Sequence, residues 1–288
     1  TEVTRDARVW VGCRQTPAFL QDIGRYWPKM LDEKIIPDLE KKIIVSNYPF
    51  PHAIINNCLP LEIVKRAEQE CIGLNQSVTA GSPQFQKTKK VLYDYLKMPF
   101  VLKKTIDFLH SQDFLHILER KFNLKNLLPD WKLFGGGLHE SFRGGFLKIH
   151  SDFIHMRKSK LKRRLNLILY LNSNWDENWG GAIELWDKKM ISAKKIILPK
   201  INNAVIFRTD FNSNHGFPEP INCPDNVTRK SLALYYYTQE KTVLPITLKR
   251  RKYFHAVWKK RPNVNEPKFA DNDPFFKRLK HKFFYRFF

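Results

Sequence analysis

Residues 145–153 read "GFLKIHSDF" and combine a strand-like apolar alternation with two residues that can bind a metal. In an extended chain, side chains two positions apart lie on the same face. His150 and Asp152 are therefore expected to point into one space. An H-x-D pair alone is weak evidence, because many such pairs are only polar neighbours. The rest of the chain decides between a metal site and a polar pair.

This stretch belongs to a longer region of short strands. From about residue 131 to 238, apolar and aromatic runs are separated by Gly, Asn, Asp and Pro; they are "WKLFGGGLHE", "GFLKIHSDF", "RRLNLILYLN", "GAIELWD", "KKIILP", "NAVIFRT" and "KSLALYYYT". This density of strands predicts a barrel or a sandwich. Before residue 131 the spacing is helical instead, with helices expected at 61–74 and, as one long helix or two short ones, at 99–122. Residues 77–98 are polar and are predicted to form a loop. We therefore expect a mainly β fold with N-terminal helices.

The chain divides into three parts. Residues 1–45 are expected to be an N-terminal extension that is partly helical. Residues 46–240 form the main domain, with helical support at 46–130 and the β core at 131–240. Residues 241–288 form a basic aromatic tail.

Charge and cysteine content limit the partners and the compartment. The formal net charge is +22, and residues 249–288 alone hold 13 Lys/Arg against three Asp/Glu. Such a surface attracts nucleic acid, anionic lipid or acidic substrates. The four cysteines are scattered without a C-x-x-C pair, which argues against a disulfide framework or a thiolate zinc site and favours a reducing compartment. Because no apolar run is long enough to span a membrane and no signal peptide is visible, we expect a cytoplasmic location.

Two further segments strengthen the metal hypothesis. His215 follows the apolar run "NAVIFRT". Two histidines and one carboxylate are the set that binds Fe(II) on one face of an octahedron and leaves three positions open. Arg229 and Ser231 begin the last strand and share one of its faces. An arginine there can pair with a carboxylate through two parallel hydrogen bonds.

Together these motifs resemble the Fe(II)- and 2-oxoglutarate-dependent dioxygenases, specifically the prolyl-hydroxylase-like branch. The matching motifs are H-x-D at 150–152, R-x-L-N-x-x-x-Y-L-N at 163–172, G-G-x-x-x-L at 180–185, the distal His215, and R-x-S at 229–231. They occur in the order of that family between residues 131 and 238. The resemblance implies a double-stranded β-helix, or jelly roll, with the N-terminal helices packed on one sheet.

The resemblance also implies roles for individual residues. His150, Asp152 and His215 match the iron ligands. The cosubstrate residues are Arg229, which holds the distal carboxylate of 2-oxoglutarate, its companion Ser231, Tyr170, whose hydroxyl reaches the same carboxylate, and Ile183, which lines the pocket. The candidates on the substrate side are His139, Phe142, Trp175 and Tyr235. Two departures are the long spacing between His215 and Arg229 and the lack of a tyrosine shortly before the H-x-D.

The strand at 163–172 predicts how the main sheet is covered. Leu167, Leu169 and Leu171 alternate with Asn166, Ile168 and Tyr170. We expect the leucines to pack against the helical layer and the other three side chains to face the pocket.

The activity implied by the resemblance consumes O2 and 2-oxoglutarate, releases succinate and carbon dioxide, and hydroxylates an unactivated C–H bond. Ascorbate is a candidate auxiliary reductant. The expected substrate is a prolyl or similar residue in a protein or peptide. One alternative is a glycan or lipid-linked sugar at a membrane surface, and an alternative of another class is a non-catalytic binding module on the same scaffold. The charge does not exclude nucleic acid.

The tail ends in "PFFKRLKHKFFYRFF" (274–288), which has a helical pattern. Phe276, Leu279, Phe283 and Phe287 recur every three or four residues and lie on one helical face, with Lys and Arg filling much of the remainder. A basic helix with an aromatic stripe suits an anionic membrane surface. The expected location is then peripheral, at the inner face of a membrane. A helix docked on the barrel itself is the alternative.

Overall fold

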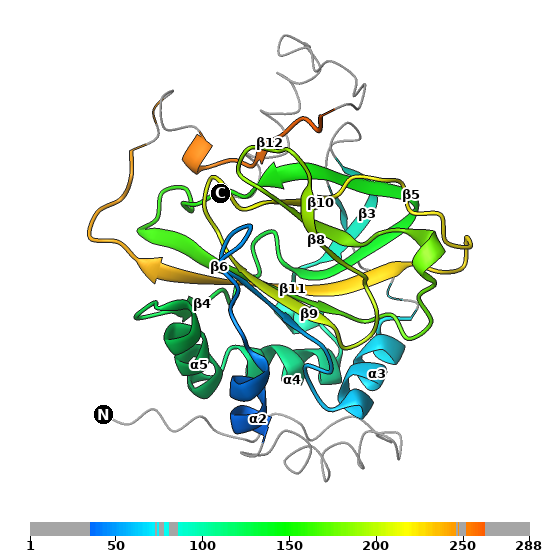
Figure 1. Cartoon of the computed structure of the whole chain (residues 1–288). Coiled ribbons are helices and arrows are strands. Elements are labelled where there is room, and N and C mark those ends of the chain that lie inside the picture. The colour runs from blue at the N-terminus through cyan, green and yellow to red at the C-terminus, as the bar shows by residue number, and fades with distance from the viewer. Residues whose placement is uncertain are drawn as a thin grey trace, which may run out of the picture.

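The computed structural model describes residues 35–72, 74, 78–80, 86–245, 247 and 252–262. Within this part of the chain, antiparallel strands curl into a nearly closed barrel, and helices cover one side of it (Figure 1). The expectation of a mainly β jelly roll with N-terminal helices is confirmed. The strands are joined in the order β1-β9-β6-β11-β5-β10-β7-β8, and β3 and β12 pair with β5 outside this path.

The bounds of the elements follow chain order. The strands are β1 (His52–Ile55), β2 (Val78–Ala80), β3 (Gln86–Leu92), β4 (Leu128–Pro129), β5 (Gly137–Ser151), β6 (Leu161–Tyr170), β7 (Ile183–Trp186), β8 (Ala193–Ile197), β9 (Ala204–Arg208), β10 (Asn214–Phe217), β11 (Arg229–Gln239) and β12 (Val257–Trp258). The helices are α2 (Ile35–Lys42), α3 (Leu61–Glu70), α4 (Phe100–Leu109) and α5 (Gln112–Phe122), with short 3-10 turns η1 (Tyr95–Lys97) and η2 (Glu177–Trp179).

The helical run at 99–122 forms two helices, and the local sequence explains the break. The hydroxyl of Ser111 accepts a hydrogen bond from the Phe114 amide and caps α5 at its N-terminus. At the other end, Asn123 adopts a left-handed conformation and terminates α5.

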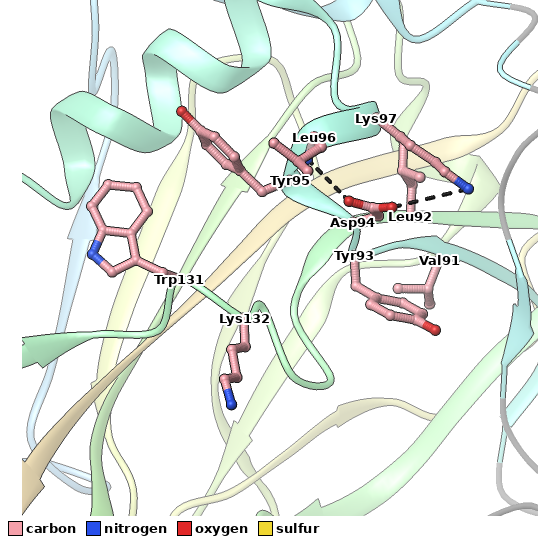
Figure 2. Close-up of a pocket in the computed structure, with 9 residues that line it drawn as sticks. All are labelled: Val91, Leu92, Tyr93, Asp94, Tyr95, Leu96, Lys97, Trp131 and Lys132. Carbon is pink, nitrogen blue, oxygen red and sulfur yellow. Dashed lines mark hydrogen bonds and ion pairs between the residues drawn. The ribbon is translucent and has the colours of Figure 1, made fainter. Parts of the chain in front are cut away.

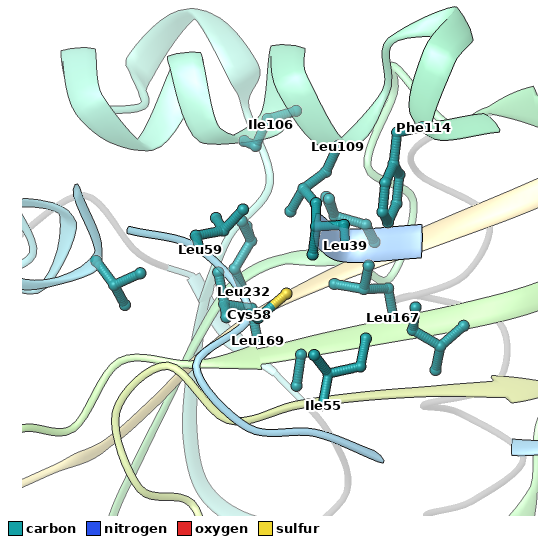
Figure 3. Packing of buried hydrophobic residues seen from close by; sticks show 14 of the residues in the cluster. Leu39, Ile55, Cys58, Leu59, Ile106, Leu109, Phe114, Leu167, Leu169 and Leu232 are labelled. Atoms are coloured by element: carbon teal, nitrogen blue, oxygen red, sulfur yellow. The ribbon is translucent and has the colours of Figure 1, made fainter. Parts of the chain in front are cut away.

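The main core lies between the helices and one face of the central strands β6 and β11. Leu165, Leu167 and Leu169 of β6 and Leu171 directly after it share a single buried cluster with Leu232 of β11 and with residues of the helices. Figure 3 shows Leu167, Leu169 and Leu232 of this cluster. Ile168 and Tyr170 belong to a different cluster, on the barrel side. The predicted division of this strand into a helix-facing and a pocket-facing set is therefore confirmed.

Inside the barrel, side chains line up in rows across neighbouring strands, because residues directly opposite each other share a face. In one row, Lys89 of β3 lies opposite Ser141 of β5, which lies opposite Arg229 of β11. The next row holds Val91, His139, Ser231 and Tyr170. These rows form the wall of the candidate site.

The sheet takes more of the N-terminal half than the sequence predicted. The loop expected at 77–98 contains β2 and β3. This part of the prediction was wrong, because β3 pairs with the distant β5 and β2 pairs with β3. The two runs expected at 131–153 form one 15-residue strand, β5. His215 lies within its own strand, β10, rather than just after one.

A segment beyond residue 240 also joins the barrel. β12 pairs with β5, with Trp258 opposite His150, and the Lys259 amide donates to the Ile149 carbonyl. The boundary placed at residue 240 did not anticipate this pairing. The tail helix expected at 274–288 and most of the N-terminal extension lie outside the described residues. Among the helices of the described ranges, none has the length and apolar character needed to cross a membrane.

Candidate functional site

Three potential metal ligands meet where β5 and β10 run side by side. His150 and His215 are direct partners in the β5–β10 register, and Asp152 follows the end of β5. Nε2 of His150 lies 3.4 Å from Oδ1 of Asp152, and Nε2 of His215 lies 3.5 Å from Oδ2. The candidate ligand atoms all lie within 4.8 Å of one another. One divalent cation could contact all three residues.

Both histidines are held with one ring nitrogen turned toward this space. Nδ1 of His150 lies 2.9 Å from the Lys148 carbonyl, and Nδ1 of His215 lies 2.9 Å from the Ser213 carbonyl. A carbonyl only accepts, so each Nδ1 carries the proton and each Nε2 presents a lone pair. Such bonds orient metal-binding histidines. Burial, together with the neighbouring His150, lowers the pKa of His215 to about 4, which keeps its ring neutral at pH 7.

Asp152 is held as a carboxylate by two buried neighbours. Oδ2 of Asp152 accepts a hydrogen bond from the Asn166 amide at 2.7 Å and lies 3.2 Å from Nη2 of Arg163. Burial raises the pKa of Asp152, but Arg163 and the two histidines more than offset this effect and hold it well below its usual range. The carboxylate is therefore ionised and available to a cation.

Arg163 is itself fixed by its surroundings. Its Nε donates to the Asn166 side-chain carbonyl at 2.6 Å, and its guanidinium carbon lies 3.3 Å from the centre of the Tyr235 ring. Only 1% of Arg163 is exposed. The R-x-L-N motif had predicted a strand here, but not that Arg163 and Asn166 support Asp152.

A second polar cluster surrounds Arg229. Nε of Arg229 donates to the Gly181 carbonyl at 2.7 Å, and its Nη2 donates to the Tyr170 hydroxyl at 3.2 Å. The guanidinium also lies 4.3 Å from the centre of the Phe217 ring. Arg229 is 4% exposed and forms no ion pair with any carboxylate in the described ranges. A buried cation without an anion is costly, so this position favours a carboxylate-bearing ligand.

The other predicted cosubstrate residues lie around this cluster. Ser231 is opposite both Tyr170 and His139 in the strand register. Ile183 of β7 is 3% exposed and packs in the apolar cluster that includes Tyr170. The structure thus brings Arg229, Ser231, Tyr170 and Ile183 into one half of the barrel interior.

The four substrate-side candidates have different surroundings. The Tyr235 ring stacks on Arg163 and its hydroxyl donates to the Gly135 carbonyl, which also lies 3.2 Å from Nε2 of His139. Trp175 is buried among Phe217, Ile221 and Cys223, so it belongs to an apolar cluster and not to the substrate side. Phe142 lies under Lys90, on the face of β5 opposite to Ser141. Trp175 and Phe142 are therefore not brought to the ligands.

Sequence reasoning missed two residues beside the site. Lys89 enters the barrel interior from β3, in the same row as Arg229. The Trp258 ring lies with its centre 4.8 Å from that of His150. Neither residue belongs to a motif, and both strands that carry them depend on pairing with β5.

The arrangement fits a mononuclear Fe(II) centre with an acidic cosubstrate. Two imidazoles and one carboxylate form the 2-His-1-carboxylate set, and the buried Arg229 offers a partner for a carboxylate deeper in the barrel. A metal bound there would supply the oxidation chemistry; the protein residues orient the groups and exclude water.

Comparison with known proteins agrees with this geometry. Residues 136–237 match the family model described as the 2OG-Fe(II) oxygenase superfamily. The matched segment contains all three candidate ligands and Arg229. No curated protein sequence matches this chain.

Solved structures show remote similarity over most of the chain. A prolyl-4-hydroxylase from Pseudomonas putida is 15% identical, with 72% of this chain and 98% of that chain covered and a TM-score of 0.49. A Trichoplax adhaerens prolyl hydroxylase in complex with a hypoxia-inducible-factor peptide is 17% identical, with 77% and 94% covered and a TM-score of 0.48. HygX from Streptomyces hygroscopicus, with nickel and 2-oxoglutarate bound, is 10% identical, with 80% and 97% covered and a TM-score of 0.47. Similarity this remote does not identify a substrate.

Proposed function

We propose that this chain, a 2OG-Fe(II) oxygenase through residues 136–237, hydroxylates a prolyl or similar side chain in a protein or peptide. As an enzyme of this superfamily it uses Fe(II), 2-oxoglutarate and O2. The observation that supports a peptide substrate is an aromatic groove between the end of β3 and helix α4.

The groove lies where β3 leaves the barrel wall, and its volume is about 490 Å³. Its lining includes three aromatic side chains, Tyr93, Tyr95 and Trp131 (Figure 2). Leu96, also in the lining, is 80% exposed, and Trp131 is 50% exposed. The rings of Tyr95 and Trp131 meet edge to face at 5.9 Å. Large apolar side chains exposed together suggest a surface for a partner.

A short path of contacts connects the groove to the metal ligands. The Asp130 amide, next to Trp131, donates to the Tyr235 carbonyl at 3.1 Å. The Tyr235 ring stacks on Arg163, which in turn contacts Asp152. The segment that carries Trp131 is thus connected, through Tyr235 and Arg163, to the ligand Asp152.

An aromatic groove suits an extended, proline-containing segment. Such segments are already close to the polyproline conformation and lose little entropy on binding, and aromatic rings pack well against the pyrrolidine. The groove therefore supports a proline-containing peptide better than other peptide substrates.

The proposal is tested with peptides that differ only in proline content. The purified protein, with Fe(II), 2-oxoglutarate and ascorbate, is incubated with proline-containing peptides and with matched alanine versions. We expect succinate release to rise only with the proline peptides, and mass spectrometry to find one added oxygen in them. Equal stimulation by both sets, or by glycans alone, would contradict the proposal.

Two exposed apolar residues provide matched variants. Trp131→Ala removes a ring from the groove, whereas Ile191→Ala removes an exposed side chain from the loop between β7 and β8. Trp131→Ala should raise the KM for the peptide several-fold while Ile191→Ala leaves it unchanged. Identical KM values for both variants would show that the groove does not bind the peptide substrate.

A membrane-associated substrate, such as a lipid-linked sugar, is a separate proposal that depends on the tail. Its support is the Phe and Lys/Arg pattern of residues 274–288, which lie outside the described residues. Sedimentation with anionic and with neutral vesicles, comparing the full chain with one that ends at Asp273, tests it. Binding to anionic vesicles by the full chain alone supports the peripheral location, and equal binding by both argues against it.

A further inference from the structure

Lys89 enters the barrel beside the arginine expected to hold the cosubstrate. Lys89, Ser141 and Arg229 occupy one row across β3, β5 and β11, and Arg229 points inward to Tyr170 and Gly181. Residues in one row share a face, so Lys89 is directed to the same interior. Neighbouring strands lie about 4.8 Å apart, so the two side chains start roughly 10 Å from each other. Both are long enough for their charged ends to approach one ligand.

The electrostatics of Lys89 agree with this placement. Burial, followed by the Arg229 charge, lowers the pKa of Lys89 to about 7, while Asp152 opposes the change. Burial and the Lys89 charge also lower the pKa of His139. Lys89 forms no ion pair with a carboxylate in the described ranges. Lys89 and Arg229 thus share one part of the interior with no carboxylate in direct contact, and a bound dicarboxylate would stabilise both charges.

We propose that Lys89 is a second cationic anchor, beside Arg229, for the distal carboxylate of 2-oxoglutarate. The inference rests on 2-oxoglutarate being the cosubstrate, and it adds a residue outside the segment matched by the family model. The C5 carboxylate is the group it contacts, because Lys89 lies in the row of Arg229, two strands away. With both cations in place, the pocket selects a ligand with a second carboxylate.

The test measures ligand binding rather than turnover. Mn(II) replaces Fe(II), and calorimetry gives the Kd of 2-oxoglutarate and, by displacement, of 2-oxopentanoate, which has a methyl group in place of the C5 carboxylate. Lys89→Met should weaken 2-oxoglutarate about ten-fold or more, the size expected for a charge-assisted contact, and leave 2-oxopentanoate nearly unchanged. Lys89→Arg should retain most of the affinity.

Lys90→Met is the matched control. Lys90 is the next residue of β3 and lies over the Phe142 ring on the outer face, so its variant should bind both ligands as the wild type does. Unchanged 2-oxoglutarate binding by Lys89→Met would overturn the inference. An equal loss for both ligands would also overturn it, because Lys89 would then act at the metal end. A wild type that binds no 2-oxoglutarate would instead contradict the proposed function, and unchanged Mn(II) binding by Lys89→Met shows that the variant is folded.

Discussion

Gly181→Ala should weaken 2-oxoglutarate binding through Arg229, without touching the metal. A Cβ at Gly181 would lie 3.0 Å from Cδ of Arg229 and 3.3 Å from Cζ2 of Trp175. Trp175 is buried, so the arginine must give way by a few tenths of an ångström. Arg229 is also bound to the Gly181 carbonyl, so its guanidinium cannot move without losing that contact.

The expected size follows from the interaction at risk. A charge-assisted contact between a buried arginine and a carboxylate contributes about 1.5–3 kcal/mol, which corresponds to roughly ten- to a hundred-fold in Kd. A displaced guanidinium loses part of this, so we expect about a ten-fold weaker Kd for 2-oxoglutarate, measured by calorimetry with Mn(II). Because Gly181 has φ +71°, alanine should also cost about 1–2 kcal/mol of folding stability.

Gly180→Ala separates these two effects. Gly180 also has φ +71°, but a Cβ there would meet only the Pro220 carbonyl oxygen, at 3.9 Å. It should therefore lower the melting temperature at least as much as Gly181→Ala and leave the Kd of 2-oxoglutarate near the wild-type value. If the two variants bind 2-oxoglutarate equally well, crowding of Arg229 is not the cause and the reasoning is refuted.

Three other changes test the centre. Arg229→Met should raise the Kd of 2-oxoglutarate roughly ten- to a hundred-fold in the same calorimetry and leave the affinity for Mn(II) unchanged. A loss of Mn(II) affinity would show that Arg229 acts on the metal site and not on the cosubstrate. Asp152→Ala should abolish Mn(II) binding and succinate formation while circular dichroism stays native, and retained turnover would exclude this carboxylate as a ligand. The pKa of His215 is lowered to about 4 in the folded protein, so between about pH 6.5 and pH 4 only the unfolded chain takes up a proton at this residue. The free energy of unfolding of the metal-free protein should therefore fall by on the order of 3 kcal/mol over this pH range. Thermal unfolding of His215→Gln should lack that contribution, and identical pH profiles would show that burial does not keep this ring neutral.

The sequence predicts those parts of the site in which the residues lie within a few positions of each other on one strand. The H-x-D spacing puts His150 and Asp152 on one face of an extended chain, and the R-x-S spacing does the same for Arg229 and Ser231. The alternation along residues 165–171 likewise predicts which side of β6 meets the helices. These inferences need only the local geometry of a strand.

The remaining features depend on pairing between distant segments. Lys89 lies in a run rich in polar residues, and its inward direction follows only from the register of β3 against β5. Asn166 was expected in the pocket, but its bond to Asp152 depends on how β6 lies relative to the end of β5. Trp175 was expected on the substrate side, whereas packing with Phe217 and Ile221 buries it.

The pairing of β12 with β5 has a consequence for when the site can mature. The backbone of His150 is flanked on one side by His215 and on the other by Trp258, more than one hundred residues downstream of it. During synthesis the chain emerges from its N-terminus, and β3 can already pair with β5 between Leu138 and Leu147. On that same edge, the backbone of His150 and Ser151 stays unpaired until residue 258 has left the ribosome. The side of the centre next to Trp258 is therefore completed only after all the other strands of the barrel have been synthesised. Nascent chains stalled shortly after residue 240 would leave the end of β5 at His150 and Ser151 without its β12 partner.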